Sequence, residues 1–248
     1  MSRPALFAIG LAVSFAMLIV ASQVSPDLAP RTDITASYRV EGDSIVLLEG
    51  TPEDWQHQAW DRWVELVPSS ARWRVGRFDA LAGEFEGQVE PLSNSLQVWS
   101  LRIAELDEEL LDVALIHELG HLVSLGPTEL VPATDPTVAD QCVTYLSLEG
   151  CAIPGHVFER FVSSFWDVEV GWESGDSAAS ARHAAAPSAF VSRYAATNPG
   201  EDIAETFTYF VYSLRPTGIT VADQKMLLLW EFPELVELRA SLRRGLIG

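Results

Sequence analysis

An apolar run from Leu110 to Leu125 encloses the string His117-Glu118-Leu119-Gly120-His121, and this feature constrains the fold most. We expect a buried helix that starts near Leu106, has the acidic residues Asp107, Glu108 and Glu109 in its first turn, and ends at Gly126-Pro127. A helix brings positions i and i+4 onto one face, so both imidazoles would point the same way. Such a pair can bind one zinc ion, and Glu118 would lie where it can take a proton from water activated by the metal. The alternative is an ordinary core helix that happens to carry two histidines.

The charge balance narrows the classes of partner. The chain has 35 acidic and 16 basic residues in 248, a formal charge of −19, and Lys225 is its single lysine. A surface this acidic repels phosphate backbones, so we expect no nucleic-acid partner. The hydrophobic fraction of 48% is typical of a packed globular protein of one large domain or two small ones.

The first residues have the pattern of a targeting segment. Arg3 precedes an uncharged apolar run from Ala5 to Ala21, which is longer than a usual secretory core of about 7–15 residues and shorter than a spanning helix of about 20. Residues 1–22 are therefore predicted to be a signal peptide or a membrane anchor, with cleavage left open. The remainder would be extracytoplasmic, secreted or tethered to the cell membrane by residues 5–21. Residues 23–45, with Pro26 and Pro30, are predicted to be a linker to a domain at 46–248.

Export makes the two cysteines interpretable. Cys142 and Cys151 lie nine positions apart, and in an oxidising compartment we expect them to form a disulfide. A loop of that length contributes about 2–3 kcal/mol by the chain-entropy argument. The alternatives are free buried thiols, or soft metal ligands together with His156.

Periodicity predicts an α+β fold. A helix should open at Thr51-Pro52-Glu53-Asp54 and end before Pro68, with Trp55, Ala59, Trp63 and Leu66 on one side. Between Arg72 and Ile103 the period falls towards two, which indicates a small, antiparallel sheet with strands near 73–78 and 96–101. We expect an extended substrate to pair with the second of these strands.

Past Gly126 the pattern is mainly helical. Helices are predicted over 137–148, 155–168, 198–214 and 221–244, the last bent near Pro233. Residues 173–188, rich in Ala, Ser and Gly, are predicted to be a mobile loop that could act as a lid.

Two histidines need a third protein ligand to hold a catalytic zinc ion. The metzincin continuation is absent, because its glycine and histidine positions are Ser124 and Pro127. Helix 198–214, with a capping asparagine and a first-turn proline, offers Glu201 and Glu205 one turn apart on one face. Asp202 ranks second, since it points about 100° away from Glu201. The alternative for these acids is a solvated helix face.

Two motifs in this order resemble those of the gluzincin metallopeptidases, in particular the catalytic domain of anthrax lethal factor and the bacterial zinc-binding peptidases similar to it. The motifs are His117-Glu118-x-x-His121 and Tyr194-Ala-Ala-Thr-Asn-Pro-Gly-Glu201-Asp-Ile-Ala-Glu205-Thr-Phe. The resemblance implies that Glu201 is the third zinc ligand, that Glu205 orients a ligand histidine, and that the Tyr194 hydroxyl faces the developing oxyanion. It also implies a zincin-like catalytic domain at 46–248.

Residues and resemblance together predict an exported zinc metallopeptidase that holds one Zn²⁺ per chain and cleaves a peptide or protein substrate. Its catalytic residues would be Glu118 and Tyr194. A catalytically silent, zinc-stabilised binding module at the cell surface is the competing reading, although it has no need of Glu118. Hydrolysis of a non-peptide amide would use the same residues.

Overall fold

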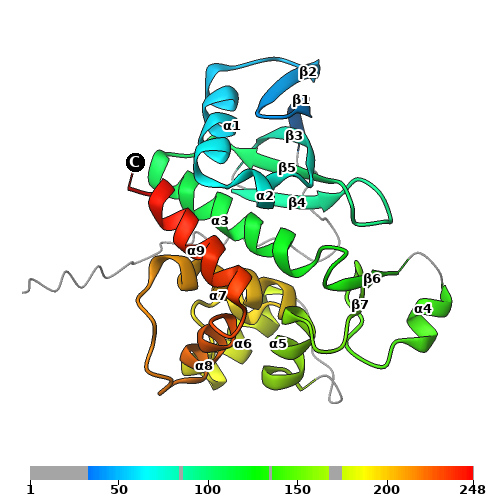
Figure 1. Cartoon of the computed structure of the whole chain (residues 1–248), viewed down its shortest axis with the longest axis vertical. Coiled ribbons are helices and arrows are strands. Elements are labelled where there is room, and N and C mark those ends of the chain that lie inside the picture. Colours follow the sequence, from blue (N-terminus) through cyan, green and yellow to red (C-terminus); the bar gives the residue numbers. More distant parts are fainter. Residues whose placement is uncertain (1–32, 84–85, 134–135, 168–174, 248) are drawn as a thin grey trace, which may run out of the picture. The chain divides into compact units, whose positions relative to one another are not determined.

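The computed structural model describes residues 33–83, 86–133, 136–167 and 175–247 (Figure 1). The predicted signal or anchor segment and residues 23–32 lie outside these ranges. In the described part of the chain, no helix combines the length and the apolar character that a membrane span requires.

Mixed helices and strands make up residues 33–247, which confirms the α+β class. The strands are β1 (Asp33–Glu41), β2 (Ser44–Gly50), β3 (Val75–Ala82), β4 (Gly87–Pro91), β5 (Trp99–Ala104), β6 (Leu130–Pro132) and β7 (Gly150–Ala152). The helices are α1 (Asp54–Leu66), α2 (Ser69–Arg72), α3 (Glu108–Ser124), α4 (Pro136–Gln141), α5 (Val157–Phe165), α6 (Asp176–Ala185), α7 (Pro199–Tyr212), α8 (Val221–Leu229) and α9 (Pro233–Gly245), with 3₁₀ turns η1 (Pro187–Ala189) and η2 (Tyr194–Ala196).

The main sheet has five strands in the order β2-β1-β3-β5-β4. All its pairs are antiparallel except β3 and β5, which are parallel, so the sheet is mostly antiparallel, and this one pair departs from the expectation. The cause is that β4 and β5 form an antiparallel pair in which β5 inserts next to β3 and leaves β4 at the edge. β5 therefore has a partner on both sides, and the prediction that substrate pairs with residues 96–101 is wrong.

The predicted linker is wrong over its second half. Residues 33–41 form β1, which pairs with β2 on one side and β3 on the other. Tyr38 and Ala36 are buried in the core although this segment carries few large apolar groups. Its neighbours in the sheet supply the apolar surface that the segment itself lacks.

Helix α1 packs its apolar side on the sheet. The rings of Trp60 and Phe78 lie 5.8 Å apart, and Ala59, Trp63 and Leu66 are also buried. The hydroxyl of Thr51 suggests a cap at that position, but Glu53 caps the helix, through a capping box with Gln56.

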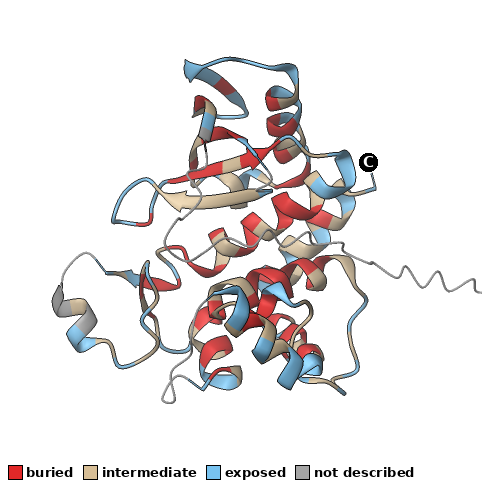
Figure 2. Cartoon of the chain, turned by 180° about the vertical axis from the view of Figure 1, so that it is seen from behind, coloured by how far each residue is buried: buried red, intermediate tan, exposed pale blue. Residues whose placement is uncertain are grey.

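Helix α3 runs between the sheet and the later helices (Figures 1 and 2). Asp107 caps it by accepting a hydrogen bond from the backbone N–H of Leu110 at 3.0 Å, so it begins within two residues of the predicted start. Its buried positions cover several sides of the helix, as an apolar helix in a core requires: Val113, Ala114, Leu115, Ile116, Glu118, Leu119, Gly120, Leu122 and Ser124.

Three predictions about the later half need correction. Residues 142–148 are not helical, since α4 ends at Gln141 and the chain turns back towards β7. Residues 176–185, which we predicted to be part of a mobile loop, form helix α6, because five of these ten positions are alanine, the best helix former, and none is glycine. The span 221–244 is two helices, α8 and α9, that meet just before Pro233.

The cysteine prediction is confirmed. Cys142 and Cys151 form a disulfide with a Cα–Cα distance of 5.6 Å. The bond closes the turn between α4 and β7. His156 takes no part in it, and its Nδ1 lies 3.8 Å from the carboxylate of Glu129.

Candidate metal centre

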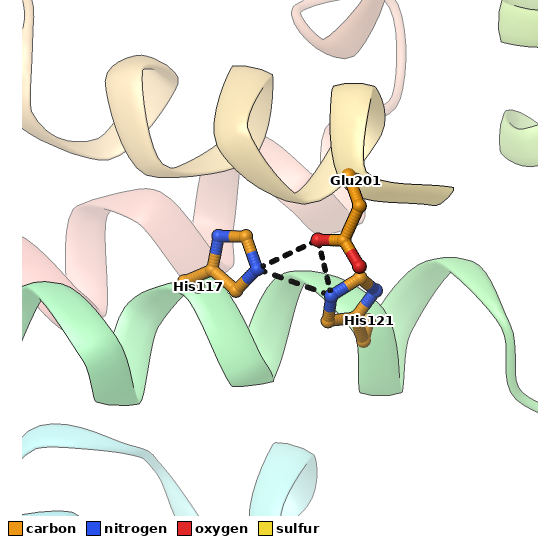
Figure 3. Close-up of side chains that lie close together, drawn as sticks. All are labelled: His117, His121 and Glu201. Atoms are coloured by element: carbon orange, nitrogen blue, oxygen red, sulfur yellow. Dashed lines mark hydrogen bonds and ion pairs between the residues drawn. The ribbon is translucent and has the colours of Figure 1, made fainter. Parts of the chain in front are cut away.

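Three side chains from two helices converge on one point (Figure 3). His117 and His121 project from α3, and Glu201 extends towards them from the first turn of α7. The Nε2 atoms of the two histidines are 3.1 Å apart, and each lies 3.2 Å from Oε2 of Glu201. This cluster can hold a metal ion, since one ligand atom of each side chain lies within 4.8 Å of the other two.

The start of α7 sets the position of Glu201. The side chain of Asn198 accepts a hydrogen bond from the backbone N–H of Glu201 at 2.9 Å, and Pro199 occupies the first turn. The cap, the proline and the helix start near 198 are as predicted. Glu201 therefore stands on a helix terminus that its own sequence fixes.

Asp202, the second-ranked carboxylate, points away from the cluster. Its Oδ2 accepts a hydrogen bond from Lys225 Nζ at 2.5 Å and another from Trp166 Nε1 at 2.8 Å. All of its side chain is buried, and burial raises its pKa to about 6. Asp202 thus belongs to a buried ion pair between α7 and α8.

Glu205 lies behind His117, one turn after Glu201. Its Oε1 is 3.0 Å from His117 Nδ1, so it can fix the tautomer that leaves Nε2 facing the cluster. Burial alone would lower the pKa of His117, but the hydrogen bonds to Glu201 and Glu205 raise it well above the ordinary value. The two imidazoles lower the pKa of Glu201 against the opposing effect of its burial.

Glu118 lies between α3 and the edge strand β4. Its side chain is buried, and its Oε2 has no hydrogen-bond partner among the described residues. Burial raises the pKa of this carboxyl, while the two histidines and the backbone N–H of Val89 lower it. A buried carboxylate oxygen without a partner costs free energy, which a purely structural role for Glu118 does not explain.

Tyr194 lies over the same cluster. Its ring centre is 5.9 Å from that of His117, and 39% of the residue is exposed. Burial of the hydroxyl, followed by the nearby carboxylates of Glu201, Glu118 and Glu205, raises its pKa well above 10. The hydroxyl therefore keeps its proton at neutral pH and can donate a hydrogen bond.

The sequence analysis missed two residues of this region. Ser192 donates a hydrogen bond to Glu205, and Gly120 allows α3 and α7 to approach closely. A glycine in the interior of an apolar helix is a usable signal of close packing. No pattern in the sequence marks Ser192.

The chain matches no known protein-family model, no curated protein and no solved structure. The interpretation of the metal centre therefore rests on the residues and the geometry of this chain.

Proposed function

We propose that this protein is an exported zinc metallopeptidase of the gluzincin type. The observation that carries the proposal is the convergence of His117, His121 and Glu201. Glu201 lies 84 residues after His117 in the sequence, yet their side chains are in contact. The carboxylate of Glu118 and the hydroxyl of Tyr194 adjoin the same point, as hydrolysis of a peptide bond requires.

The donor set fits zinc. Two imidazole nitrogens and one carboxylate are the ligands of catalytic zinc sites that keep a fourth position open. Zn–N and Zn–O bonds of about 2.0–2.1 Å in a tetrahedron separate ligand atoms by about 3.3 Å. The three separations of 3.1, 3.2 and 3.2 Å agree with that value.

When bound, zinc would act as a Lewis acid that makes a water molecule acidic and polarises the scissile carbonyl. The protein residues supply the rest. Glu118 accepts the proton of the attacking water and passes it to the leaving amine, and its raised pKa suits a group that must both take and release a proton. Tyr194 donates a hydrogen bond to the oxygen on which negative charge develops. Glu205 fixes the orientation of the His117 ring through the contact with its Nδ1.

Strand β4 offers a place for an extended substrate. It pairs only with β5, so its other edge is open within the main sheet. It also packs beside α3, where a Cβ on Gly87 would lie 3.2 Å from Oε1 of Glu118. A peptide that pairs with β4 would therefore place its backbone next to Glu118.

A second observation supports an extracytoplasmic location. A disulfide such as Cys142–Cys151 persists in oxidising surroundings, and residues 1–22 have the composition of an export signal or anchor. We place the catalytic domain outside the cytoplasm on this basis.

Metal content and a peptide library test the proposal. The wild type should contain about one zinc per chain and cleave peptides in the library. His121→Ala should lose the metal, whereas the matched exposed histidine variant His57→Ala should keep it. Glu118→Gln should keep zinc and lose cleavage, and Glu109→Gln, an exposed glutamate on the same helix, should retain both.

Two outcomes would overturn the proposal. A wild type without zinc would remove the metal centre. A wild type that binds zinc but cleaves no peptide would favour the binding module at the cell surface.

A further inference from the structure

The carboxylate of Glu205 has two partners, one on each oxygen. Oε1 lies 3.0 Å from Nδ1 of His117, and Oε2 accepts a hydrogen bond from the hydroxyl of Ser192 at 2.5 Å. The same hydroxyl accepts a hydrogen bond from the backbone N–H of Ala195 at 3.0 Å. Ser192 therefore joins the carboxylate behind His117 to the turn η2, which begins at Tyr194.

Ser192 and Tyr194 contact two carboxylates of the same helix. Ser192 holds Glu205, while the Tyr194 hydroxyl interacts with Glu201, one turn earlier on α7. Two side chains of one short segment, residues 192–194, thus each contact one of two carboxylates on the same face of α7. A movement of the segment would change the environment of His117 and the position of Tyr194 together.

We propose that Ser192 is a positioning residue that couples the orientation of His117 to the placement of Tyr194. Its hydroxyl holds Glu205 in the rotamer that bonds His117, and it fixes the turn that carries Tyr194 over the cluster. The part that concerns Tyr194 rests on the proposed function. The part that concerns His117 requires only that the cluster binds zinc.

Other residues in and next to this segment contact α6 and α8 instead of the carboxylates of α7. Arg193 donates a hydrogen bond to Ser180 of α6 at 3.1 Å, and the ring of Phe190 lies 4.0 Å from Lys225 Nζ. These contacts attach the segment to α6 and α8. Ser180 is therefore a matched control, because it also supplies a hydroxyl to this segment but does not touch Glu205.

The test compares Ser192→Ala, Ser192→Thr, Ser192→Val and Ser180→Ala in the full chain. Zinc affinity is measured by competition with a chelator, and kcat and KM are measured on a peptide that the wild type cleaves. Loss of a partner behind a metal ligand weakens metal affinity about 10–100-fold. Ser192 lies one hydrogen bond further from the cluster than such a partner, so Ser192→Ala should lower zinc affinity by about tenfold, the low end of this range, and should lower kcat at nearly unchanged KM.

The Thr and Val variants have the same shape and differ in the hydroxyl, so they keep the test decisive if the Ala variant folds poorly. Ser192→Thr should stay within about threefold of the wild type, Ser192→Val should resemble Ser192→Ala, and Ser180→Ala should match the wild type. Equal zinc affinity of the Thr and Val variants would overturn the proposal. A wild type that binds zinc and cleaves nothing would refute the peptidase function alone, and the zinc comparison would still decide the role of Ser192.

Discussion

Gly120 of α3 lies directly against Ala204 of α7. A Cβ built on Gly120 would stand 2.9 Å from the Cα, 3.2 Å from the backbone oxygen and 3.3 Å from the Cβ of Ala204. The two helices therefore approach at this point more closely than any side chain at position 120 allows. This approach lies between His117 and His121 on one helix and beside Glu201 on the other, so it sets the distance across which the metal ligands meet.

Replacing Gly120 with alanine should separate the two helices. The backbone atoms of Ala204 cannot yield as a flexible side chain would, so we expect a loss of about 1–3 kcal/mol in the free energy of unfolding. This loss should appear although alanine is the better helix former by about 1 kcal/mol. Urea unfolding and chelator competition measure both effects. A variant as stable as the wild type, with the same zinc affinity, would contradict the packing argument.

Lys225 should contribute strongly to the stability of the packing between α7 and α8. Its ammonium is buried against Asp202 and the Phe190 ring, and Lys225→Met would leave the Asp202 carboxylate buried without its cation. Breaking a buried ion pair from one side costs about 3–5 kcal/mol. Urea unfolding of Lys225→Met should show a loss of this size.

The double variant Lys225→Met/Asp202→Asn serves as the control for that measurement. Asparagine keeps an acceptor for Trp166 without a charge, so the double variant should recover much of the lost stability. Equal losses of stability in the single and double variants would show that the loss comes from the shape of the side chain at position 225 and not from the unpaired charge of Asp202.

Zinc affinity should increase with pH around neutrality. Hydrogen bonds to Glu201 and Glu205 raise the pKa of His117 in the metal-free protein, so its imidazole keeps its proton to a higher pH than a free imidazole does. Zinc binds only the neutral imidazole, and each binding event must release this proton. Affinity should therefore fall about tenfold for each unit of pH decrease below the pKa of His117. Chelator competition between pH 6 and 7.5 measures this slope, and a flat profile would disprove it.

Tyr194→Phe should separate catalysis from metal binding. The ring remains in contact with His117, but the hydroxyl that would face the developing negative charge is gone. Loss of such a donor lowers kcat about 10²–10³-fold. Zinc affinity should fall much less than kcat, because none of the three ligand side chains is altered. A parallel loss of zinc would assign Tyr194 to the metal centre itself.

Reduction of the disulfide should weaken the fold locally and spare the metal centre. The bond joins α4 to β7 over a separation of nine residues, and its removal should cost about 2–3 kcal/mol. The variant Cys142→Ser/Cys151→Ser should therefore melt at a lower temperature and bind zinc as the wild type does. Mass measurement with and without reductant, after alkylation, checks that the native protein has no free thiol.

Local signals in the sequence predicted the parts of the site that depend on neighbours along the chain. The acidic first turn located the start of α3 to within two residues, and Asn198 with Pro199 located the start of α7, because a cap satisfies backbone N–H groups only a few residues away. The i, i+4 spacing likewise placed His117 and His121 on one face whatever the rest of the fold did.

Local signals of this kind do not predict strand order or the side chains that contact one another across the core. The insertion of β5 beside β3 and the inclusion of residues 33–41 in the sheet depend on pairing between distant strands. The salt bridge of Asp202 with Lys225 and the bond from Ser192 to Glu205 could not be read from spacing either, since each joins helices or turns whose contact the packing creates.

The amino-acid sequence by itself determined two helices that carry candidate metal ligands, and a cysteine pair close enough along the chain to bond. Only the tertiary structure decided that the two helices touch at Gly120 and Ala204 and that Glu201 reaches both imidazoles. The physical reason is range: capping and helical periodicity act within about one or two turns, whereas the approach of α3 to α7 is set by how the whole core packs.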